Sequence, residues 1–308
     1  ETERTLAALS EVTSAPYTIY QRSKAADMAF EPVLDKDGNT LPMSFAVYEN
    51  QYETSPDIVL RHNAFASFTK GLKAYENTYG ATWATEIKKN VVLAKLRGYK
   101  SATHMLLKGQ EVSIDVYNNL HDIILTELAP HMRRYTRLRK KLLRLDKMLY
   151  CDIEAPIDPG FSPKTTFEKA SKIILDGLSV LGPEYNRIIS DALKHRWIDL
   201  ADNIGKSTGA FCNSVPGVHP YILITWTNSM RNALTLAHEL GHAGQGVLAQ
   251  RNQRLTASRP SMFFIEAPST INELLVGNHI LEKSSDPRMR RWIIMQFLTT
   301  YHHNFVRH

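Results

Sequence analysis

The chain is poor in cysteine and has no long hydrophobic segment. Its two cysteines, Cys151 and Cys212, are too few for a disulfide framework and too far apart for a thiolate metal cluster. It contains no run of about 18 apolar residues, and no basic stretch followed by an apolar signal core opens the chain. We therefore expect a protein of the reducing cytoplasm that neither spans nor crosses a membrane.

Composition places the chain among ordinary globular proteins. Charged residues make up 22% and hydrophobic residues 43% of 308 residues, which excludes a disordered or collagen-like chain. This length predicts two domains or one large domain. Three prolines between residues 156 and 163 mark a boundary, so we predict a helical domain over 1–150 and a second region over 151–308. The missing initiator Met, and a C-terminus that stops within a helical apolar pattern, predict a fragment of a longer protein.

The first 150 residues have mainly helical patterns. Ser55, directly before Pro56, is the predicted cap of a helix that carries an aromatic stripe. The segment 35–39 between apolar runs predicts a hairpin turn and not a calcium loop, because Gly38 stands at the fourth position and not the sixth, and Ala46 stands where the loop needs a final Glu. A long helical pattern then follows from Val112 to Leu149, with a kink expected near Pro130.

The second half of this long helix is strongly basic. Residues 130–150 contain eight Lys and Arg residues against Asp146, a net charge of +7, whereas the whole chain carries +6. Such a face either binds an acidic partner or is simply solvated. We favour the solvated face and predict no nucleic-acid partner, because no recognition motif or interleaved aromatic side chains accompany the charges.

Several helices and one strand are predicted after residue 160. Helical patterns cover 165–181 and 183–195, and the best strand of the sequence is Tyr221–Trp226. The triplet 205–207 (Gly-Lys-Ser) resembles a phosphate-binding loop, but Leu200 stands where that motif needs a glycine, so we predict no nucleotide site.

The third of these helices carries the most specific motif in the chain. Asn228 or Ser229 can cap a helix that runs to about residue 250, and His238 and His242 in its middle are separated by one turn on one face. Two imidazoles so placed can bind one tetrahedral metal ion. Glu239 projects beside the metal, where a carboxylate can take a proton from a metal-bound water.

Downstream acids complete the predicted site. Glu266 follows an apolar segment and precedes Pro268, which belongs in the first turn of a helix, so its carboxylate can be the third ligand of a catalytic zinc. Glu273 lies on the same helix face and either hydrogen-bonds a liganding imidazole or is an exposed acid. The glycines at 241, 244 and 246 indicate either close approach by another helix or a substrate, or a helix that frays after His242.

These residues resemble the thimet oligopeptidase family of zinc peptidases, and within it the oligoendopeptidase F branch. The resemblance rests on the segments 238–242 and 266–273, and it extends to 95–99, 130–134 and 205–212. It implies a mainly α fold enclosing a deep channel, which residues 1–150 would line, with a small β-sheet beside the zinc. It also implies cytoplasmic cleavage of short unstructured oligopeptides.

The resemblance also indicates what this chain lacks. Members of the family are about twice as long, and their downstream part contains a Tyr- and His-rich loop that helps bind the substrate and stabilise the oxyanion. No segment here matches that loop, and we assign Tyr301, His302 and His303 to helix packing. The missing N- and C-terminal segments are therefore expected partners of this chain.

The predicted reaction is zinc-assisted peptide hydrolysis with one zinc per chain. His238, His242 and Glu266 would hold the metal, which lowers the pKa of its water to about 7, while Glu239 moves the proton to the leaving amine. An extended substrate could pair with the edge of the strand that contains Tyr221. The residues 209–211 (Gly209, Ala210 and Phe211) would line its approach.

Three alternatives stay open. The first is a catalytically incompetent zinc-binding fragment that binds peptides or a missing segment without turnover. The second, a basic nucleic-acid binder, rests only on residues 133–147 and leaves the zinc motif unexplained. The third, a secreted protease of the thermolysin type, usually has its acidic ligand at a shorter interval after the second histidine.

Overall fold

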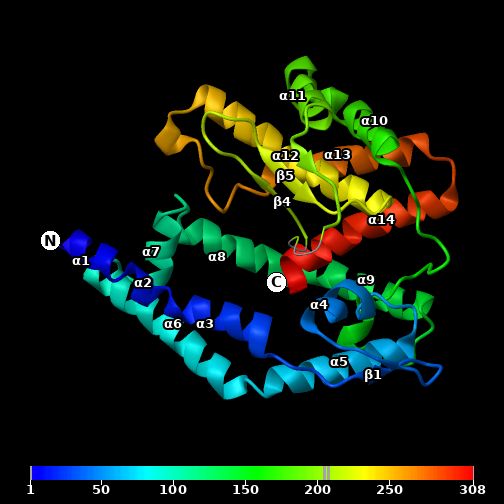
Figure 1. Ribbon diagram of the computed structural model, residues 1–308, viewed down its shortest axis with the longest axis horizontal. Helices are drawn as coiled ribbons and strands as arrows, with labels where there is room; N and C mark the ends of the chain where they lie inside the picture. The colour runs from blue at the N-terminus through cyan, green and yellow to red at the C-terminus, as the bar shows by residue number, and fades with distance from the viewer. Residues whose placement is uncertain (1, 204–205, 207–208, 308) are drawn as a thin grey trace. The chain divides into compact units, whose positions relative to one another are not determined.

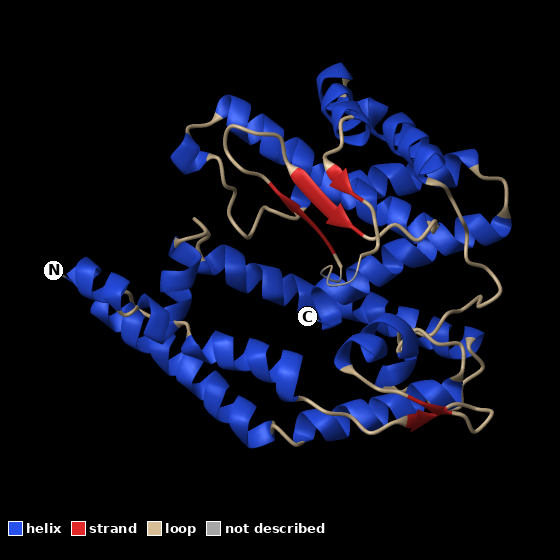
Figure 2. Cartoon of the chain, viewed as in Figure 1, coloured by secondary structure: helices blue, strands red, loops and turns tan. Residues whose placement is uncertain are grey.

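A computed structural model describes residues 2–203, 206 and 209–307. The chain forms two compact units, an N-terminal unit of Glu1–Gly109 with Ser113–Pro159 and a C-terminal unit of Gln110–Val112 with Gly160–His308. Helices dominate both units (Figures 1 and 2), which confirms the predicted mainly α fold. No helix in the part of the chain described here is long and apolar enough to cross a membrane.

The N-terminal unit is helical apart from one short hairpin. The strands β1 (Val33–Leu34) and β2 (Thr40–Leu41) pair antiparallel around the predicted turn at 35–39. The helices are α1 (Thr2–Ala8), α2 (Ser10–Thr13), α3 (Ala15–Arg22), α4 (Phe45–Val47), α5 (Ile58–Lys73), α6 (Glu76–Leu96), α7 (Ala102–Lys108), α8 (Ile114–Ile123) and α9 (Ala129–Leu142). Shorter helical turns lie at Ser23–Asp27, Tyr48–Tyr52, Ile124–Leu128 and Tyr150–Asp152.

The residue that caps the start of α5 is not the predicted one. Asp57, and not Ser55, caps the helix, because its carboxylate accepts hydrogen bonds from the backbone N–H groups of Val59 and Leu60. The hydroxyl of Ser55 instead accepts a hydrogen bond from the N–H of Asp57. The aromatic face of α5 packs as expected, with the ring of Phe68 stacked on Tyr48 at a centroid distance of 4.2 Å.

The long helix predicted from Val112 to Leu149 is interrupted and shorter. A π-helical turn at Ile124–Leu128 separates α8 from α9 just before Pro130. The helix α9 ends at Leu142, and Arg144 adopts a left-handed backbone conformation with φ of 55°, which turns the chain away.

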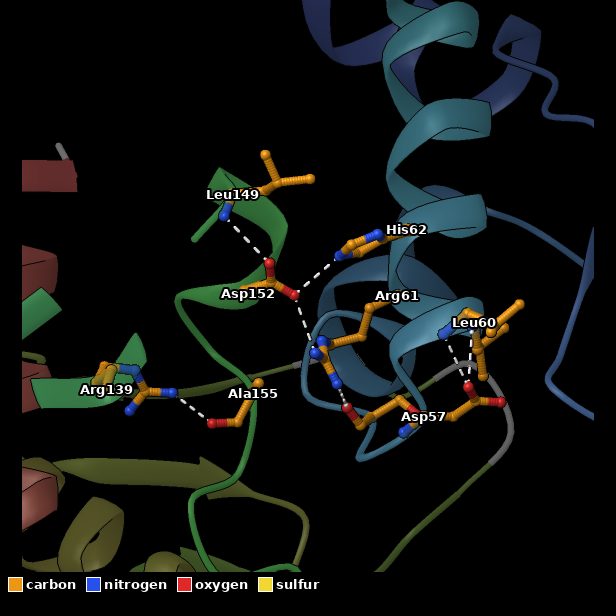
Figure 3. A network of polar contacts seen from close by, with 10 residues as sticks. Asp57, Leu60, Arg61, His62, Arg139, Leu149, Asp152 and Ala155 are labelled. Atoms are coloured by element: carbon orange, nitrogen blue, oxygen red, sulfur yellow. Dashed lines mark hydrogen bonds and ion pairs between the residues drawn. The ribbon is translucent and has the colours of Figure 1, made fainter. Parts of the chain in front are cut away.

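The buried face of α9 is also shifted from the prediction. Met132, Tyr135 and Arg139 are its buried residues, whereas Leu138 and Leu142 are exposed. The guanidinium of Arg139 donates hydrogen bonds to the hydroxyl of Tyr135 and to the carbonyl of Ala155 (Figure 3). Arg139 is therefore a packing residue of this unit and not part of a solvated basic face.

A buried ion pair ties α5 to the segment after α9 (Figure 3). The carboxylate of Asp152 is fully buried and accepts hydrogen bonds from Arg61 at 2.9 Å, from His62 at 3.0 Å and from the N–H of Leu149 at 3.1 Å. Burial alone would raise the pKa of Asp152, but these three donors more than offset that cost and lower it. We refer to Asp152 and its three donors as the Asp152 clasp.

In the described residues of the C-terminal unit, five helices pack with a three-stranded sheet. The helices are α10 (Phe167–Leu178), α11 (Pro183–Lys194), α12 (Met230–Asn252), α13 (Ala267–Lys283) and α14 (Pro287–His302). Shorter turns lie at Ser179–Leu181, Leu255–Ala257 and His303–Arg307. The core is formed by buried residues of all five of these helices together with Ile222 and Ile224 of the sheet. Of the three residues assigned to helix packing, only His302 is buried. Tyr301 is 44% exposed, and it lines, together with His303, a cavity that His238 and Glu266 also line.

The sheet has the order β3-β5-β4, which corrects one prediction. The strand β5 (Tyr221–Ile224) pairs in parallel with β3 (Ile198–Asp199) and antiparallel with β4 (Ala210–Asn213). The strand with the strongest apolar pattern is thus the central one, because its residues Ile222 and Ile224 are buried against the core. Its edges are already paired, so it cannot accept an added peptide strand.

Part of the triplet that resembles a phosphate loop lies outside the described residues. Of its members, Lys206 is described, and its ammonium donates hydrogen bonds to the backbone carbonyls of Asp199, Ala201 and Ile224. This lysine therefore ties the ends of β3 and β5 together.

Candidate metal centre

The helix α12 presents two histidines to one side. Ser229 caps it by accepting a hydrogen bond from the N–H of Asn232, in agreement with the predicted start. The rings of His238 and His242 lie one turn apart, with centroids separated by 4.9 Å and planes inclined by 81°. Their Nε2 atoms point to the same carboxylate, that of Glu266.

Glu266 lies at the first turn of α13, two residues before Pro268. Its Oε2 atom is 3.1 Å from Nε2 of His238 and 3.3 Å from Nε2 of His242. Ligand atoms of a tetrahedral zinc ion at about 2.0–2.1 Å from the metal are about 3.3 Å from one another. The spacing of the donors therefore fits one zinc ion, and two imidazoles with one carboxylate are a donor set that zinc accepts.

Two further side chains of α13 orient these donors. The carboxylate of Glu273 lies 2.5 Å from Nδ1 of His238, which leaves Nε2 of that ring for a metal. The hydroxyl of Ser269, fully buried, donates to Oε2 of Glu266 at 2.8 Å and to the carbonyl oxygen of the same residue at 2.9 Å. The sequence prediction missed Ser269, although its position one turn after Glu266 is a signal that could have suggested it.

Glu239 is buried beside the donors, and its carboxylate makes no hydrogen bond to the side chains of His238, His242 or Glu266 in the described structure. Burial raises its pKa to about 7, and the carboxylates of Glu266 and Glu273 contribute in the same direction while His238 opposes them. A carboxyl group with this pKa can accept and release a proton near neutral pH.

The pKa values of the two histidines are shifted in opposite directions. Burial lowers the pKa of His242. Burial has the same tendency at His238, but the hydrogen bond and charge of Glu273 outweigh it and raise the pKa of that ring. His242 is therefore the more readily neutral donor in the absence of a metal.

A cavity of about 630 Å³ opens beside the donors. His238, Glu239, His242 and Glu266 line one side of it, and the strand β4 lines another. Of the predicted substrate-binding residues, Ala210 and Phe211 line this cavity and Gly209 directly precedes β4 with φ of +86°. Tyr221 belongs to β5 and lines a different cavity, so the structure does not bring it to the donors.

The glycines of α12 mark close approaches, and the helix continues to Asn252 without fraying after His242. A Cβ atom on Gly241 would lie 2.5 Å from Cα of Ser269 in α13, and one on Gly244 would lie 2.5 Å from the ring of Tyr185 in α11. Gly246 meets Ser214 in the same way. Gly241 meets backbone that cannot move aside, so this position must lack a side chain, whereas Gly244 and Gly246 meet side chains.

Comparison with known proteins identifies the family. The model of Peptidase family M3 matches residues 51–305. The chain belongs to peptidase family M3. Among curated proteins, it is 34% identical to oligopeptidase PepF of Bacillus subtilis over 296 residues, which are 96% of this chain and 44% of that protein. It is 31% identical to an oligoendopeptidase F homologue of Borreliella burgdorferi, over 94% of this chain and 48% of that protein.

Solved structures agree with this M3 assignment. The oligoendopeptidase-F of Enterococcus faecium matches with a TM-score of 0.71 at 25% identity, over 100% of this chain and 48% of that one. A structure from Chlamydophila abortus matches with a TM-score of 0.82 at 25% identity, over 97% of this chain and 50% of that one. The chain thus spans about half the length of these relatives.

Proposed function

We propose that this chain forms the zinc-binding part of a metallopeptidase that hydrolyses short, unstructured oligopeptides. The observation that carries the proposal is the convergence of Nε2 of His238, Nε2 of His242 and Oε2 of Glu266 within one cavity that Glu239 also lines. Membership of peptidase family M3 supports the reaction class. One zinc ion per chain would supply a Lewis acid for the scissile carbonyl and a water of lowered pKa.

Glu239 is the proposed proton carrier. Its side chain is buried next to the donors, where its carboxylate would accept a proton from the attacking water and pass it to the leaving amine. Glu273 would hold the ring of His238 in the orientation that presents Nε2, and Ser269 would do the same for the carboxylate of Glu266.

The strand β4 is the proposed platform for the peptide. Among the described residues, β4 pairs only with β5, so its other edge is available for an added strand. Main-chain hydrogen bonds to this edge, at Ala210 to Asn213, would hold a peptide of almost any sequence next to the donors. This replaces the central strand β5 as the expected binding edge.

Three parts of the sequence prediction remain predictions. These are the channel lined by residues 1–150, the cytoplasmic location and the contribution of further segments to turnover. A zinc-binding fragment without turnover is the alternative that the experiment below separates from a peptidase.

Replacing Glu239 with Gln tests the proton carrier. We expect Glu239→Gln to keep one zinc per chain and to lower cleavage of an internally quenched peptide by about 10²–10⁴-fold, because the ligands are untouched and the base is lost. Metal content and cleavage are measured on the same preparation of the protein that contains this chain. Loss of zinc would make Glu239 a ligand, and undiminished cleavage would remove it from the reaction.

Two acids of the same stretch provide a matched test of the third ligand. We expect Glu266→Ala to weaken zinc binding by more than about 100-fold, beyond the effect typical of residues that only orient a ligand. Glu282→Ala, an exposed acid on α13, should leave the affinity unchanged. Equal zinc affinity in the two variants, measured by competition with a chelator, would exclude Glu266 from the site.

A further inference from the structure

One buried amide next to the donors is not explained by the proposed reaction. The side chain of Asn272 in α13 is 1% exposed and directly precedes Glu273. Its Nδ2 atom donates to the carbonyl oxygen of Ala237 at 3.1 Å, and its Oδ1 atom accepts from the hydroxyl of Tyr185 at 3.1 Å. Ala237 is the residue before His238, so this amide links the two helices that carry the donors.

The helices α11, α12 and α13 approach one another closely around the amide of Asn272. Gly241 of α12 lies against the backbone of Ser269 in α13, and Gly244 lies against the ring of Tyr185 in α11. The same tyrosine ring that fills the space above Gly244 thus carries the hydroxyl that fixes Asn272. Burial of this hydroxyl raises the pKa of Tyr185, so it remains a donor at neutral pH.

The geometry of the donors depends on how far α13 is shifted along α12. The histidines project from α12, while Glu266 and Glu273 project from α13, so a sliding of one helix changes every distance between them. The hydrophobic effect is non-directional, so burial of apolar surface does not by itself select one register of the two helices. A hydrogen bond accepts only a narrow range of distances and angles, and a metal site tolerates deviations of only about 0.2 Å.

We infer that Asn272 is a positioning residue that fixes the register of α13 against α12, and that Tyr185 holds the Asn272 amide in the required orientation. The inference rests on the proposed zinc site and adds to it a contact that touches no ligand atom. A purely structural amide would stabilise the fold without affecting the affinity for the metal. The two roles are therefore separable by measuring zinc binding and stability on the same variants.

The test uses zinc affinity, the spectrum of bound cobalt and thermal stability. We expect Asn272→Ala to bind zinc about 10–100-fold more weakly and to change the visible absorption of bound Co²⁺, which reports ligand geometry. Tyr185→Phe removes one hydroxyl and should weaken zinc binding measurably, by about three- to tenfold, which is less than the loss expected for Asn272→Ala. Asn272→Leu, of similar volume, provides a second variant that keeps the packing of α13.

Asn186→Ala is the matched control. The amide of Asn186 in α11 also donates to a backbone carbonyl of a neighbouring helix, that of Leu175 in α10 at 3.0 Å, and this bond joins two helices that carry none of the proposed ligands. We expect this variant to lower the melting temperature while zinc affinity stays within about twofold of the parent. Its result shows how much zinc affinity changes when a helix-to-helix amide bond is lost elsewhere in the unit.

The outcomes separate this inference from the proposed function. If the parent binds zinc and both Asn272 variants bind it equally well with an unchanged cobalt spectrum, the inference is wrong and the zinc site stands. If the parent binds no zinc, both are wrong. If neither Asn272 variant folds, Tyr185→Phe decides, because weaker zinc binding supports the inference and unchanged binding overturns it.

Discussion

Among the residues that the structure describes, two clusters of side chains have ligand atoms close enough to share a metal ion, one in each unit. His238, His242 and Glu266 form the first, and His62, Cys151 and Asp152 form the second. Proximity of donors is therefore not what distinguishes them. They differ in what already occupies the lone pairs of their carboxylates and in the charges that surround them.

In the second cluster, the carboxylate oxygens are already used as hydrogen-bond acceptors within the protein. Both carboxylate oxygens of Asp152 accept hydrogen bonds, and one donor is the permanently charged guanidinium of Arg61, which would repel a divalent ion (Figure 3). The pKa of the Cys151 thiol is raised, first by burial and then by the charge of Asp152, so it is not a ready thiolate ligand. This cluster stabilises the fold of its unit.

The first cluster is arranged in the opposite way. The side chain of Glu266 is 61% exposed, and the Nε2 atoms of both histidines face it at the wall of a cavity. The groups that contact these donors from behind, Glu273 and Ser269, orient them without occupying the space between them. The proposed metal centre thus presents donor atoms that converge on one point, whereas the carboxylate and the imidazole of the second cluster are already used by hydrogen bonds within the protein.

The sharpest test of this comparison removes two residues from each cluster. We expect His238→Ala/His242→Ala to abolish zinc binding, because only one protein donor remains, and His62→Ala/Cys151→Ala to keep one zinc per chain. Metal content after dialysis against a weak chelator gives the result, with circular dichroism as a check of the fold. Zinc retained by the first double variant or lost from the second would reverse the roles of the two clusters.

A second test concerns stability. Asp152→Ala should lower the free energy of unfolding by about 3–5 kcal/mol, because it leaves the buried guanidinium of Arg61 without its counterion. Asp37→Ala, which breaks an exposed pair with Lys36 in the same unit, should cost less than about 1 kcal/mol. Urea unfolding followed by circular dichroism measures both. Equal effects would mean that the clasp contributes no more than a surface pair.

Local patterns in the sequence predicted the parts of the site that depend on neighbouring residues. The one-turn spacing of His238 and His242 and the proline after Glu266 place these side chains through helix geometry alone. The caps were less certain, because Ser55 and Asp57 are both good capping residues and only the structure shows which one accepts the bonds.

Long-range contacts could not be predicted in this way. The central place of β5 depends on its pairing with two strands, and the burial of Arg139 depends on a carbonyl that follows α9. The Asp152 clasp joins residues about 90 positions apart, so no periodicity reveals it. We predicted that Arg139 lies on a solvated face because the sequence shows that this residue is charged but does not show which group it contacts.

The last prediction concerns how the stability of each cluster depends on pH. In the metal-free chain the pKa of buried Glu239 is raised from 4.5 to about 7, so the folded state binds a proton that the unfolded state has released. The resulting stability is fully present below pH 4.5 and is lost as the pH rises towards 7. We expect Glu239→Gln, which stays neutral, to gain up to about 3 kcal/mol relative to the parent over this range.

The Asp152 clasp should respond in the opposite direction. Because the pKa of Asp152 is lowered from 3.8 in the folded protein, its contribution is complete above pH 3.8 and is lost as the pH falls through the folded value. The difference between the parent and Asp152→Asn should therefore shrink only in acid, where the difference between the parent and Glu239→Gln is also smallest. Urea unfolding between pH 3 and 8 with a chelator present measures both differences. If the Glu239→Gln difference does not change between pH 4.5 and 7, Glu239 is already ionised in the folded chain over this range. The predicted contrast between Glu239, which titrates near neutral pH, and Asp152, which stays ionised there, would then be wrong.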